Sequence, residues 1–336
     1  MSENRQFRLA ARPDGEIKDS DFELVTESIP KPVDNQFVVA TTHISLDPAM
    51  RGWMSAARSY IPPVKVGGVM RALVVGRVTA SRHPKFAPGD WVHGPFGVQE
   101  YAVSDGLGAY RIEVTDRLTP ASYLGVLGLT GLTAYFGLLD VGRLRQGESV
   151  LVSGAAGGVG TAVGQIAKIK GATVVGVAGG PEKCRMLVEE LGFDGAIDYK
   201  GGDLHDALRE ETPDRVDVFF DNVGGVVLDE GLTRLQRDAR VVICGAVSHY
   251  NAREPVAGPG NYLALLVSRA SMTGFVVSDF AMRYQDAIAE LAGWVNEGRL
   301  RSIEDTVEGD IEIFPGMLAR LFSGQNTGKL ALQLKA

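Results

Sequence analysis

A glycine-rich turn lies between a short apolar run and a helical segment near the middle of the chain. The run Val150–Ser153 is apolar, the sequence from Gly154 to Gly160 has the spacing G-x-x-G-x-x-G, and residues 161–169 return to helical periodicity. A strand, a glycine loop and a helix in this order are typical of a nucleotide-binding βα unit. The stretch therefore predicts a dinucleotide-binding fold around which the chain is organised.

Each glycine of the loop has a physical role in this prediction. An early glycine permits the turn off the strand, a central one lets a pyrophosphate approach the backbone, and Gly160 lets the helix pack close to the sheet. The first-turn N–H groups and the positive end of the helix dipole then face the phosphates. The alternative is that these glycines serve only as turn residues in an α/β domain. The residues expected to bind the cofactor here are Gly157, Gly158, Val159 and Gly160.

Apolar strands alternate with helical segments after this loop. The pattern predicts strands over residues 172–177, 196–198, 216–220 and 240–244, with a helix over 181–191. Continuous apolar strands separated by helices are what a parallel sheet buried on both faces requires. The predicted fold class is α/β, with a doubly wound parallel sheet of the Rossmann type.

The composition narrows the class of protein. The chain has 336 residues, of which 45% are apolar, enough for two domains with full cores. Its net charge is −7 and its basic residues form no tract, so we expect no nucleic-acid partner. The two cysteines, Cys184 and Cys244, are too few for a disulfide framework or a four-cysteine zinc site, and they favour a reducing, cytoplasmic location.

Neither the N-terminus nor the longest uncharged run predicts a membrane segment. The first six residues are polar, so we expect no signal peptide. Residues 123–139 are uncharged, but four glycines interrupt them and the run is shorter than the ~20 residues that span a bilayer. We expect this run to form buried helical structure within the protein.

The residues on either side of the α/β region predict a second domain. Up to about residue 120, short β-rich runs are broken by prolines, as in a mostly antiparallel β domain. A late amphipathic helix is predicted over 280–296, and residues 304–307 and 329–334 are strand-like again. The last strand needs a partner to bury its leucines, so we expect the tail to complete the first domain. The expected domains are residues 1–122 with 302–336, and residues 123–301.

Motifs spread over nearly the whole chain fit the pattern of one family. They are Met50-Arg-Gly52, Tyr60-Ile-Pro-Pro63, residues 127–135, the glycine loop, Asp221-Asn-Val-Gly-Gly225, residues 244–251 and Asn326-Thr-Gly-Lys329. In these motifs the chain resembles the zinc-independent medium-chain dehydrogenases/reductases, in their group of leukotriene B4 12-hydroxydehydrogenases and prostaglandin and alkenal double-bond reductases. The resemblance implies a GroES-like β domain, a Rossmann domain, a substrate cleft between them and a homodimer joined at the Rossmann sheet edge.

The end of the second predicted strand bears on the choice of cofactor. NAD-specific folds place an acidic side chain there for the ribose 2′-hydroxyl, whereas a 2′-phosphate needs cations and small residues. Here the strand ends in glycines, and Lys183 follows in the next helix. In similar enzymes the matching lysine binds the 2′-phosphate with a tyrosine that looks like Tyr199. We expect NADP(H), although the charge of Glu182 would oppose a phosphate unless it points away.

The resemblance implies further cofactor contacts at strand ends. Asn222 would touch the cofactor, with support of the Asn-Val-Gly-Gly turn as its alternative role. Cys244 also ends a strand, and from that position we expect it to line the cofactor groove as a small buried thiol, with a special role of the thiol as the alternative. The remaining expected contacts are the backbone of Phe275, Val276 and Val277 with the nicotinamide carboxamide, and Asn326 with the phosphates.

Tyr250 is the candidate catalytic residue. Reducing a carbon–carbon double bond conjugated to a carbonyl moves hydride to the β-carbon and leaves an enolate, which a phenol O–H stabilises as charge develops. Tyrosine suits this role because it is ordinarily protonated at neutral pH. Tyr60 and Tyr262 are expected to line the substrate site, with plain packing as the alternative.

The sequence lacks the zinc-ligand pattern of the zinc-dependent relatives. Where their Gly-His-Glu motif would fall, the chain reads Gly67-Gly-Val-Met-Arg71, and its five histidines do not cluster at ligand spacing. We therefore expect no metal site.

These residues lead to one hypothesis with two alternatives. The leading hypothesis is an NADPH-dependent reductase of α,β-unsaturated ketones and aldehydes that acts on apolar small molecules. A zinc-independent quinone reductase is the nearest alternative, since the same cleft can pass hydride to a quinone. The other is an NADPH-binding protein without turnover.

Overall fold

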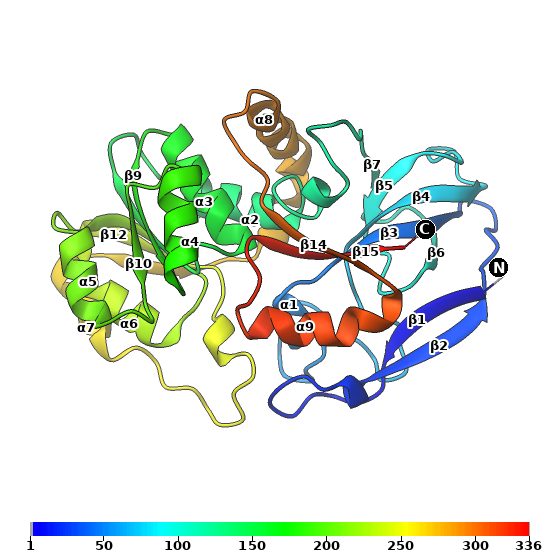
Figure 1. The fold of residues 1–336 in the computed structure, drawn as a ribbon, viewed down its shortest axis with the longest axis horizontal. Coiled ribbons are helices and arrows are strands. Elements are labelled where there is room, and N and C mark those ends of the chain that lie inside the picture. The colour runs from blue at the N-terminus through cyan, green and yellow to red at the C-terminus, as the bar shows by residue number, and fades with distance from the viewer. Residues whose placement is uncertain (1–2, 336) are drawn as a thin grey trace. The chain divides into compact units, whose positions relative to one another are not determined.

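In the computed structural model, which describes residues 3–335, the chain divides into two units. The central unit is Gly125–Ile303, and the terminal unit comprises the chain up to Leu124 and from Glu304 onward. Each unit has its own sheet and its own cluster of buried apolar side chains (Figure 1).

A six-stranded parallel sheet forms the centre of the central unit. Its order, β10-β9-β8-β11-β12-β13, grows in one direction from β8 to β10 and in the other from β8 to β13. This reversal is the doubly wound Rossmann pattern, which confirms the predicted fold class. The strands are β8 (Ser149–Ser153), β9 (Thr173–Ala178), β10 (Gly195–Asp198), β11 (Val216–Asp221), β12 (Leu235–Ile243) and β13 (Ser271–Gly274).

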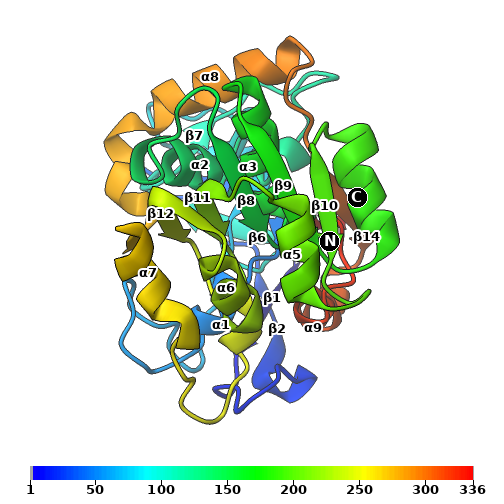
Figure 2. The same ribbon diagram turned by 90° about the vertical axis from the view of Figure 1, so that its left-hand side faces the viewer.

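Helices cover both faces of this sheet. They are α2 (Leu129–Phe136), α3 (Gly158–Ile169), α4 (Pro181–Arg185), α5 (Leu204–Glu211), α6 (Gly225–Leu232), α7 (Leu263–Ser268) and α8 (Tyr284–Asn296). Figure 2 shows α2, α3 and α8 on one side of the sheet and α5, α6 and α7 on the other. Ligands of such a sheet bind outside the carboxyl ends of the strands, so the loops at those ends are the ones that matter for function.

The prediction of a helix over 280–296 is wrong for its first turn. Residues Val277–Arg283 form a 3₁₀ helix, and α8 begins only at Tyr284. The ring of Phe280 stacks on Phe136 with centres 4.8 Å apart, and Arg283 forms an ion pair with Asp140. These tertiary contacts hold a tighter turn than the apolar periodicity alone predicts.

Strand β12 is longer than the sequence predicts. It begins at Leu235, five residues before the predicted start at residue 240, because the polar stretch Gln236-Arg-Asp238 hides its first half. Asp238 has a φ of 62°, and the pairing with β11 shifts register between Val216 and Val218. The strand is therefore regular only over its second half, which leads to the site described below.

The terminal unit holds a mostly antiparallel sheet with the order β14-β15-β3-β4-β5-β7, and β6 pairs with β3. Only the β14–β15 pair is parallel among its described strands. The tail strand β15 lies against β3 through Leu332 and Ile44, both fully buried. The strands are β3 (Phe37–Ser45), β4 (Val74–Ser81), β5 (Trp91–Gly94), β6 (Tyr101–Ser104), β7 (Tyr110–Arg111), β14 (Glu304–Gly309) and β15 (Lys329–Leu334).

A separate hairpin and two helices pack on this sheet. They are β1 (Glu3–Leu9) with β2 (Phe22–Ser28), α1 (Ala49–Trp53) and α9 (Phe314–Phe322). Phe7 and Phe22 of the hairpin meet Phe314 of α9, with ring centres 5.8 and 5.5 Å from it. The sequence pattern did not reveal this hairpin, since a long polar loop separates its strands.

The uncharged run at 123–139 is helical over α2 and buries Leu132, Ala134 and Phe136, which confirms the prediction of buried helical structure. Within residues 3–335, no helix is both long and apolar enough to cross a membrane.

Candidate functional site

The glycine loop turns the chain from β8 into α3. Gly154 has a φ of +57°, a left-handed conformation that glycine adopts without strain, and this makes the turn off the strand. Gly157 precedes α3 in an extended conformation, and no side chain within residues 3–335 caps the N-terminus of that helix. The first-turn N–H groups thus lie at the positive end of a 12-residue helix, as the binding of a pyrophosphate requires.

Gly160 makes a different close contact from the one that the sequence predicts. A Cβ atom on Gly160 would lie 2.3 Å from the carbonyl oxygen of Gly154 and 2.6 Å from Cα of Ala155. Both are backbone atoms of the glycine loop. Gly160 therefore lets the start of α3 pack against the backbone of this loop rather than against the sheet. One turn later, Gly164 makes room for a ring, since its Cβ would lie 1.9 Å from Cζ of Phe193.

The residues predicted to bind the 2′-phosphate follow the neighbouring strands β9 and β10. Gly180 has a φ of +100° and turns the chain into α4, whose first turns carry Lys183. Tyr199 follows β10, the neighbouring strand, and its side chain is 46% exposed. A Cβ on Gly179 would lie 2.9 Å from Cε1 of Tyr199, so this ring lies directly over the backbone at the tip of β9.

Asp221, at the end of β11, connects three loops of the site, a role that sequence reasoning did not find. Its fully buried carboxylate accepts hydrogen bonds from Ser153 Oγ at 2.6 Å and from the N–H groups of Val223 and Gly224 at 3.2 and 3.0 Å. Its backbone carbonyl accepts the N–H of Cys244 at 2.9 Å. Burial raises the pKa of Asp221 above its ordinary value, while the hydrogen bonds to its carboxylate oppose that rise.

Asn222 supports the loops through the same junction. Its side-chain amide donates to the carbonyl oxygen of Ser153 at 2.7 Å, and its backbone N–H donates to Ser153 Oγ at 2.8 Å. Both of these hydrogen bonds go to Ser153 and not to the Asn-Val-Gly-Gly turn itself. They join the end of β11 to the residue that precedes the glycine loop, so any contact of Asn222 with a cofactor would be set by this junction.

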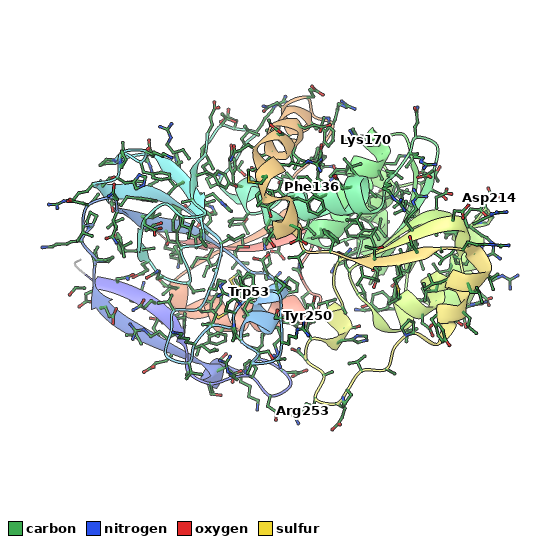
Figure 3. The ribbon with its side chains drawn as sticks, turned by 180° about the vertical axis from the view of Figure 1, so that it is seen from behind. Trp53, Phe136, Lys170, Asp214, Tyr250 and Arg253 are labelled. Atoms are coloured by element: carbon green, nitrogen blue, oxygen red, sulfur yellow. The ribbon has the colours of Figure 1, made fainter. Side chains whose placement is uncertain are left out.

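Tyr250 lies on the loop that follows β12 (Figure 3). A 3₁₀ turn over Val247–His249 brings it back toward the strand end, where its phenol oxygen accepts the N–H of Ala246 at 3.3 Å. A Cβ on Gly245 would lie 2.9 Å from the same oxygen. The phenol oxygen is thereby placed beside the carboxyl end of β12, next to the Asp221 junction.

A second hydrogen bond fixes the Tyr250 loop to the turn after β11. Ser248 Oγ donates to the carbonyl oxygen of Val223 at 2.6 Å, and the Ser248 N–H donates to the same oxygen at 3.2 Å. The loop is thus held from both sides, by Asp221 at its start and by Val223 at its middle.

The other residues predicted for the central unit also lie at strand ends. Cys244 directly follows β12, and burial, with Asp221 nearby as a smaller cause, raises the pKa of its thiol to about 12. Phe275, Val276 and Val277 follow β13, and the Phe275 ring packs inward, 6.5 Å from the ring of Phe220. Tyr262 ends a 3₁₀ turn and is 58% exposed.

Two predicted residues belong to the terminal unit. Tyr60 lies between α1 and β4 and is 63% exposed. Asn326 is buried, and its side-chain amide donates to the carbonyl oxygen of Gly328 at 2.9 Å, which shapes the turn before β15. That turn ends at Lys329, whose buried ammonium lies 2.6 Å from Asp47 Oδ1. Asn326 therefore has a structural role in this turn, whatever it does toward a cofactor.

The described residues do not provide a metal site. Within residues 3–335, no group of three or more His, Cys, Asp or Glu side chains is placed to hold a metal ion. His43 and His93, the most buried histidines, lie on β3 and β5, and the ring of His93 packs 4.8 Å from that of Tyr110.

Comparison with known proteins gives matches along almost the whole chain. Residues 5–112 match a family described as the N-terminal domain of oxidoreductase, and residues 158–293 match one described as zinc-binding dehydrogenase. The NADPH-dependent curcumin reductase of Escherichia coli is 40% identical, over 98% of this chain and 97% of its own length. The NADP(+)-dependent 2-alkenal reductase of Nicotiana tabacum is 37% identical, over 97% of this chain and 96% of its own. A crystal structure of CurA with NADPH from Vibrio vulnificus has a TM-score of 0.92 and 38% identity, covering 99% of each chain.

Proposed function

The chain belongs to the zinc-independent medium-chain dehydrogenases/reductases, in their double-bond reductase group, and we propose that it reduces α,β-unsaturated ketones and aldehydes with NADPH. The observation that carries this proposal is the similarity over nearly the full length to a curcumin reductase and a 2-alkenal reductase that both use NADP(H). Curcumin and 2-alkenals share a carbon–carbon double bond conjugated to a carbonyl, which defines the proposed substrate class.

The loops of the central unit suit NADPH. The uncapped N-terminus of α3 and the glycine loop suit a pyrophosphate, and the tip of β9 presents glycines where an NAD-specific fold carries a carboxylate. Lys183 and Tyr199 are proposed to bind the 2′-phosphate there. The proposed contacts nearer the nicotinamide are Asn222, Cys244, and the backbone of Phe275, Val276 and Val277, with Asn326 reaching the phosphates.

Tyr250 is proposed to stabilise the enolate. Bound NADPH would supply the hydride for the β-carbon of the substrate, and the negative charge would develop on the carbonyl oxygen. A proton, from the phenol or from water, would then add to the α-carbon and give the saturated carbonyl compound. The phenol of Tyr250 already accepts a hydrogen bond from the N–H of Ala246, which makes it a better donor through its own O–H. A donor fixed in advance at the developing charge lowers the barrier without reorganisation. Tyr60 and Tyr262 are proposed to face the apolar part of the substrate.

Steady-state kinetics test the proposal against its alternatives. NADPH and NADH oxidation should be followed with 2-alkenals, aryl enones and benzoquinones at equal concentrations. The proposal expects kcat/KM to be highest for NADPH with an enone or enal, and the product to be the saturated carbonyl compound. A higher kcat/KM for quinones would identify a quinone reductase. NADPH binding without oxidation by any of these acceptors would identify a binding protein.

We further propose a homodimer formed through β13, in a cytosolic protein. Among the described strands, β13 is the last in its sheet, and all four of its residues are exposed. The adjacent α7 exposes Leu266 (75%) and Val267 (71%). An exposed sheet edge beside apolar side chains is a surface that a second copy can cover. Analytical ultracentrifugation should show a dimer for the wild type, and L266E should weaken its association. V226E alters a similarly exposed valine on α6 and should leave the association unchanged. A monomeric wild type would contradict this proposal.

A further inference from the structure

Asp198, at the end of β10, has its carboxylate turned to the backbone. Asp198 Oδ1 accepts the N–H of Gly180 at 2.8 Å and the N–H of Lys200 at 3.0 Å. Gly180 belongs to the turn after β9, so this oxygen joins the ends of two neighbouring strands. The two residues that follow Asp198 are consequently held close to the tip of β9.

The side chains of Tyr199 and Lys200 both cross Gly179 at that tip. A Cβ on Gly179 would lie 3.0 Å from Cε of Lys200 and 3.1 Å from the phenol oxygen of Tyr199. The Lys200 ammonium lies 5.7 Å from the centre of the Tyr199 ring, within the range of a cation–π contact. Gly179 therefore leaves the space in which an ammonium and a phenol lie together.

The position of Lys200 matters because of what a Rossmann fold binds at the end of its second strand. The adenosine ribose lies there, and β9 is that strand in this sheet. A 2′-phosphate on this ribose would meet the negative charge of Asp198, and a nearby cation is needed to offset it. Lysine meets this need as a compact point charge on a flexible stem.

We propose that Lys200 is a specificity-determining residue that selects NADPH over NADH, acting beside Lys183 and Tyr199. The proposal rests on the proposed use of NADPH and adds a residue that sequence reasoning did not include. It assigns two functions to the end of β10: Asp198 sets the position of the backbone, and Lys200 supplies charge for the 2′-phosphate. Gly179 takes part because any side chain there would displace both Tyr199 and Lys200.

The test measures cofactor binding directly. Dissociation constants for NADPH and NADH are determined by fluorescence titration for the wild type, K200M, K200R and K168M. The K200M variant keeps the length of the stem without the charge. Lys168 is the matched control. It lies near the C-terminal end of α3, away from the carboxyl ends of the strands, and forms an ion pair there with Asp194. Circular dichroism and the urea midpoint of each variant establish that it is folded.

The expected result separates the two cofactors. In K200M, the Kd for NADPH should rise about five- to tenfold while that for NADH stays the same, and the salt dependence of NADPH binding should weaken. K200R and K168M should bind both cofactors like the wild type. An unchanged NADPH affinity in K200M, or an equal loss for both cofactors, would overturn the role of Lys200. A wild type that itself prefers NADH would overturn the proposed cofactor as well, which distinguishes the two failures.

Discussion

The carboxylate of Asp221 accepts a hydrogen bond from Ser153 Oγ at 2.6 Å, across 68 residues of sequence. The two side chains join the ends of β11 and β8. The Asn222 turn follows β11, and the glycine loop follows β8. Because the same carboxylate also accepts two N–H groups of its own turn, the geometry of both loops depends on one buried group.

Replacing Asp221 by Asn should therefore loosen the site and the fold together. The amide can accept on one side only, so at least one buried N–H or O–H donor loses its acceptor, at a cost of about 1–3 kcal/mol in the free energy of unfolding. The Kd for NADPH should rise as well, because the same hydrogen bonds hold the glycine loop and the Asn222 turn. Urea unfolding and NADPH titration check this. D217N changes the other end of the same strand, where Asp217 accepts from Ser149, and should leave the NADPH affinity alone.

Removing the phenol oxygen of Tyr250 tests its proposed catalytic role. Y250F should lower kcat for an enone by about 10- to 100-fold with little change in the Kd for NADPH, since the hydrogen bond to the enolate strengthens only as charge develops. Stopped-flow single-turnover rates isolate the hydride-transfer step. Y101F, on β6, is the matched variant and should react at the wild-type rate. A Y250F enzyme with an unchanged single-turnover rate would show that the enolate is stabilised elsewhere.

Replacing Gly160 by Ala tests how closely the loop meets its helix. The new Cβ would lie 2.3 Å from a backbone oxygen, which cannot move aside like a side chain, so the loop must shift. We expect a loss of about 1–3 kcal/mol in the free energy of unfolding and weaker NADPH binding. A Cβ on Gly293, within α8, would have open space around it, with no atom of the described part of the chain within 4 Å. G293A should therefore stabilise the protein by about 0.5–1 kcal/mol. Equal effects of the two changes would contradict the proposed packing.

Two buried histidines make the stability depend on pH. Burial lowers the pKa of His43 and of His93 to about 4, with Gln333 and Asp47 opposing the shift, respectively. In the unfolded chain both titrate near the ordinary value of about 6.5, so between those two values the unfolded chain binds more protons than the folded protein. The free energy of unfolding should then fall as pH drops from about 6.5 to 4, by on the order of 2–3 kcal/mol for each histidine.

The His93→Phe variant checks this pH dependence. Among the residues that the structure describes, neither ring nitrogen of His93 has a hydrogen-bond partner. Its ring packs on Tyr110, so phenylalanine keeps the packing and removes the titrating group. Urea unfolding at several pH values between 7 and 4 should give a shallower loss of stability for H93F than for the wild type. Identical profiles would mean that His93 does not carry the acid sensitivity.

The parallel sheet of the central unit could be predicted because its buried strands are continuous apolar runs between helices. Val150, Val174 and Val218 belong to such runs and are buried, as apolar side chains are in a sheet covered by helices on both faces. The glycine spacing predicted the turn at Gly154 for a physical reason as well, since only glycine enters that conformation without strain.

The sequence could not reveal residues whose role depends on the register between strands. Ser153 and Asp221 look like ordinary polar residues at the ends of two runs until the pairing of β8 with β11 places them side by side. Lys200 looks like a solvated residue until β10 pairs with β9 and Gly179 leaves room for it. Local contacts also shortened the late helix, where the stacking of Phe280 on Phe136 outweighed periodicity.

The pairing of β15 with β3 constrains the order in which the molecule is built. The central unit is one continuous stretch of sequence, so it can fold as soon as it has emerged from the ribosome. In the terminal unit, β3 pairs with β15, which is synthesised some 290 residues later. The terminal unit thus completes its sheet after the central unit has done so, the reverse of the usual N-terminal-first sequence of cotranslational folding. Until β15 has been synthesised, the part of β3 from His43 to Ser45 is an open edge that a chaperone can shield.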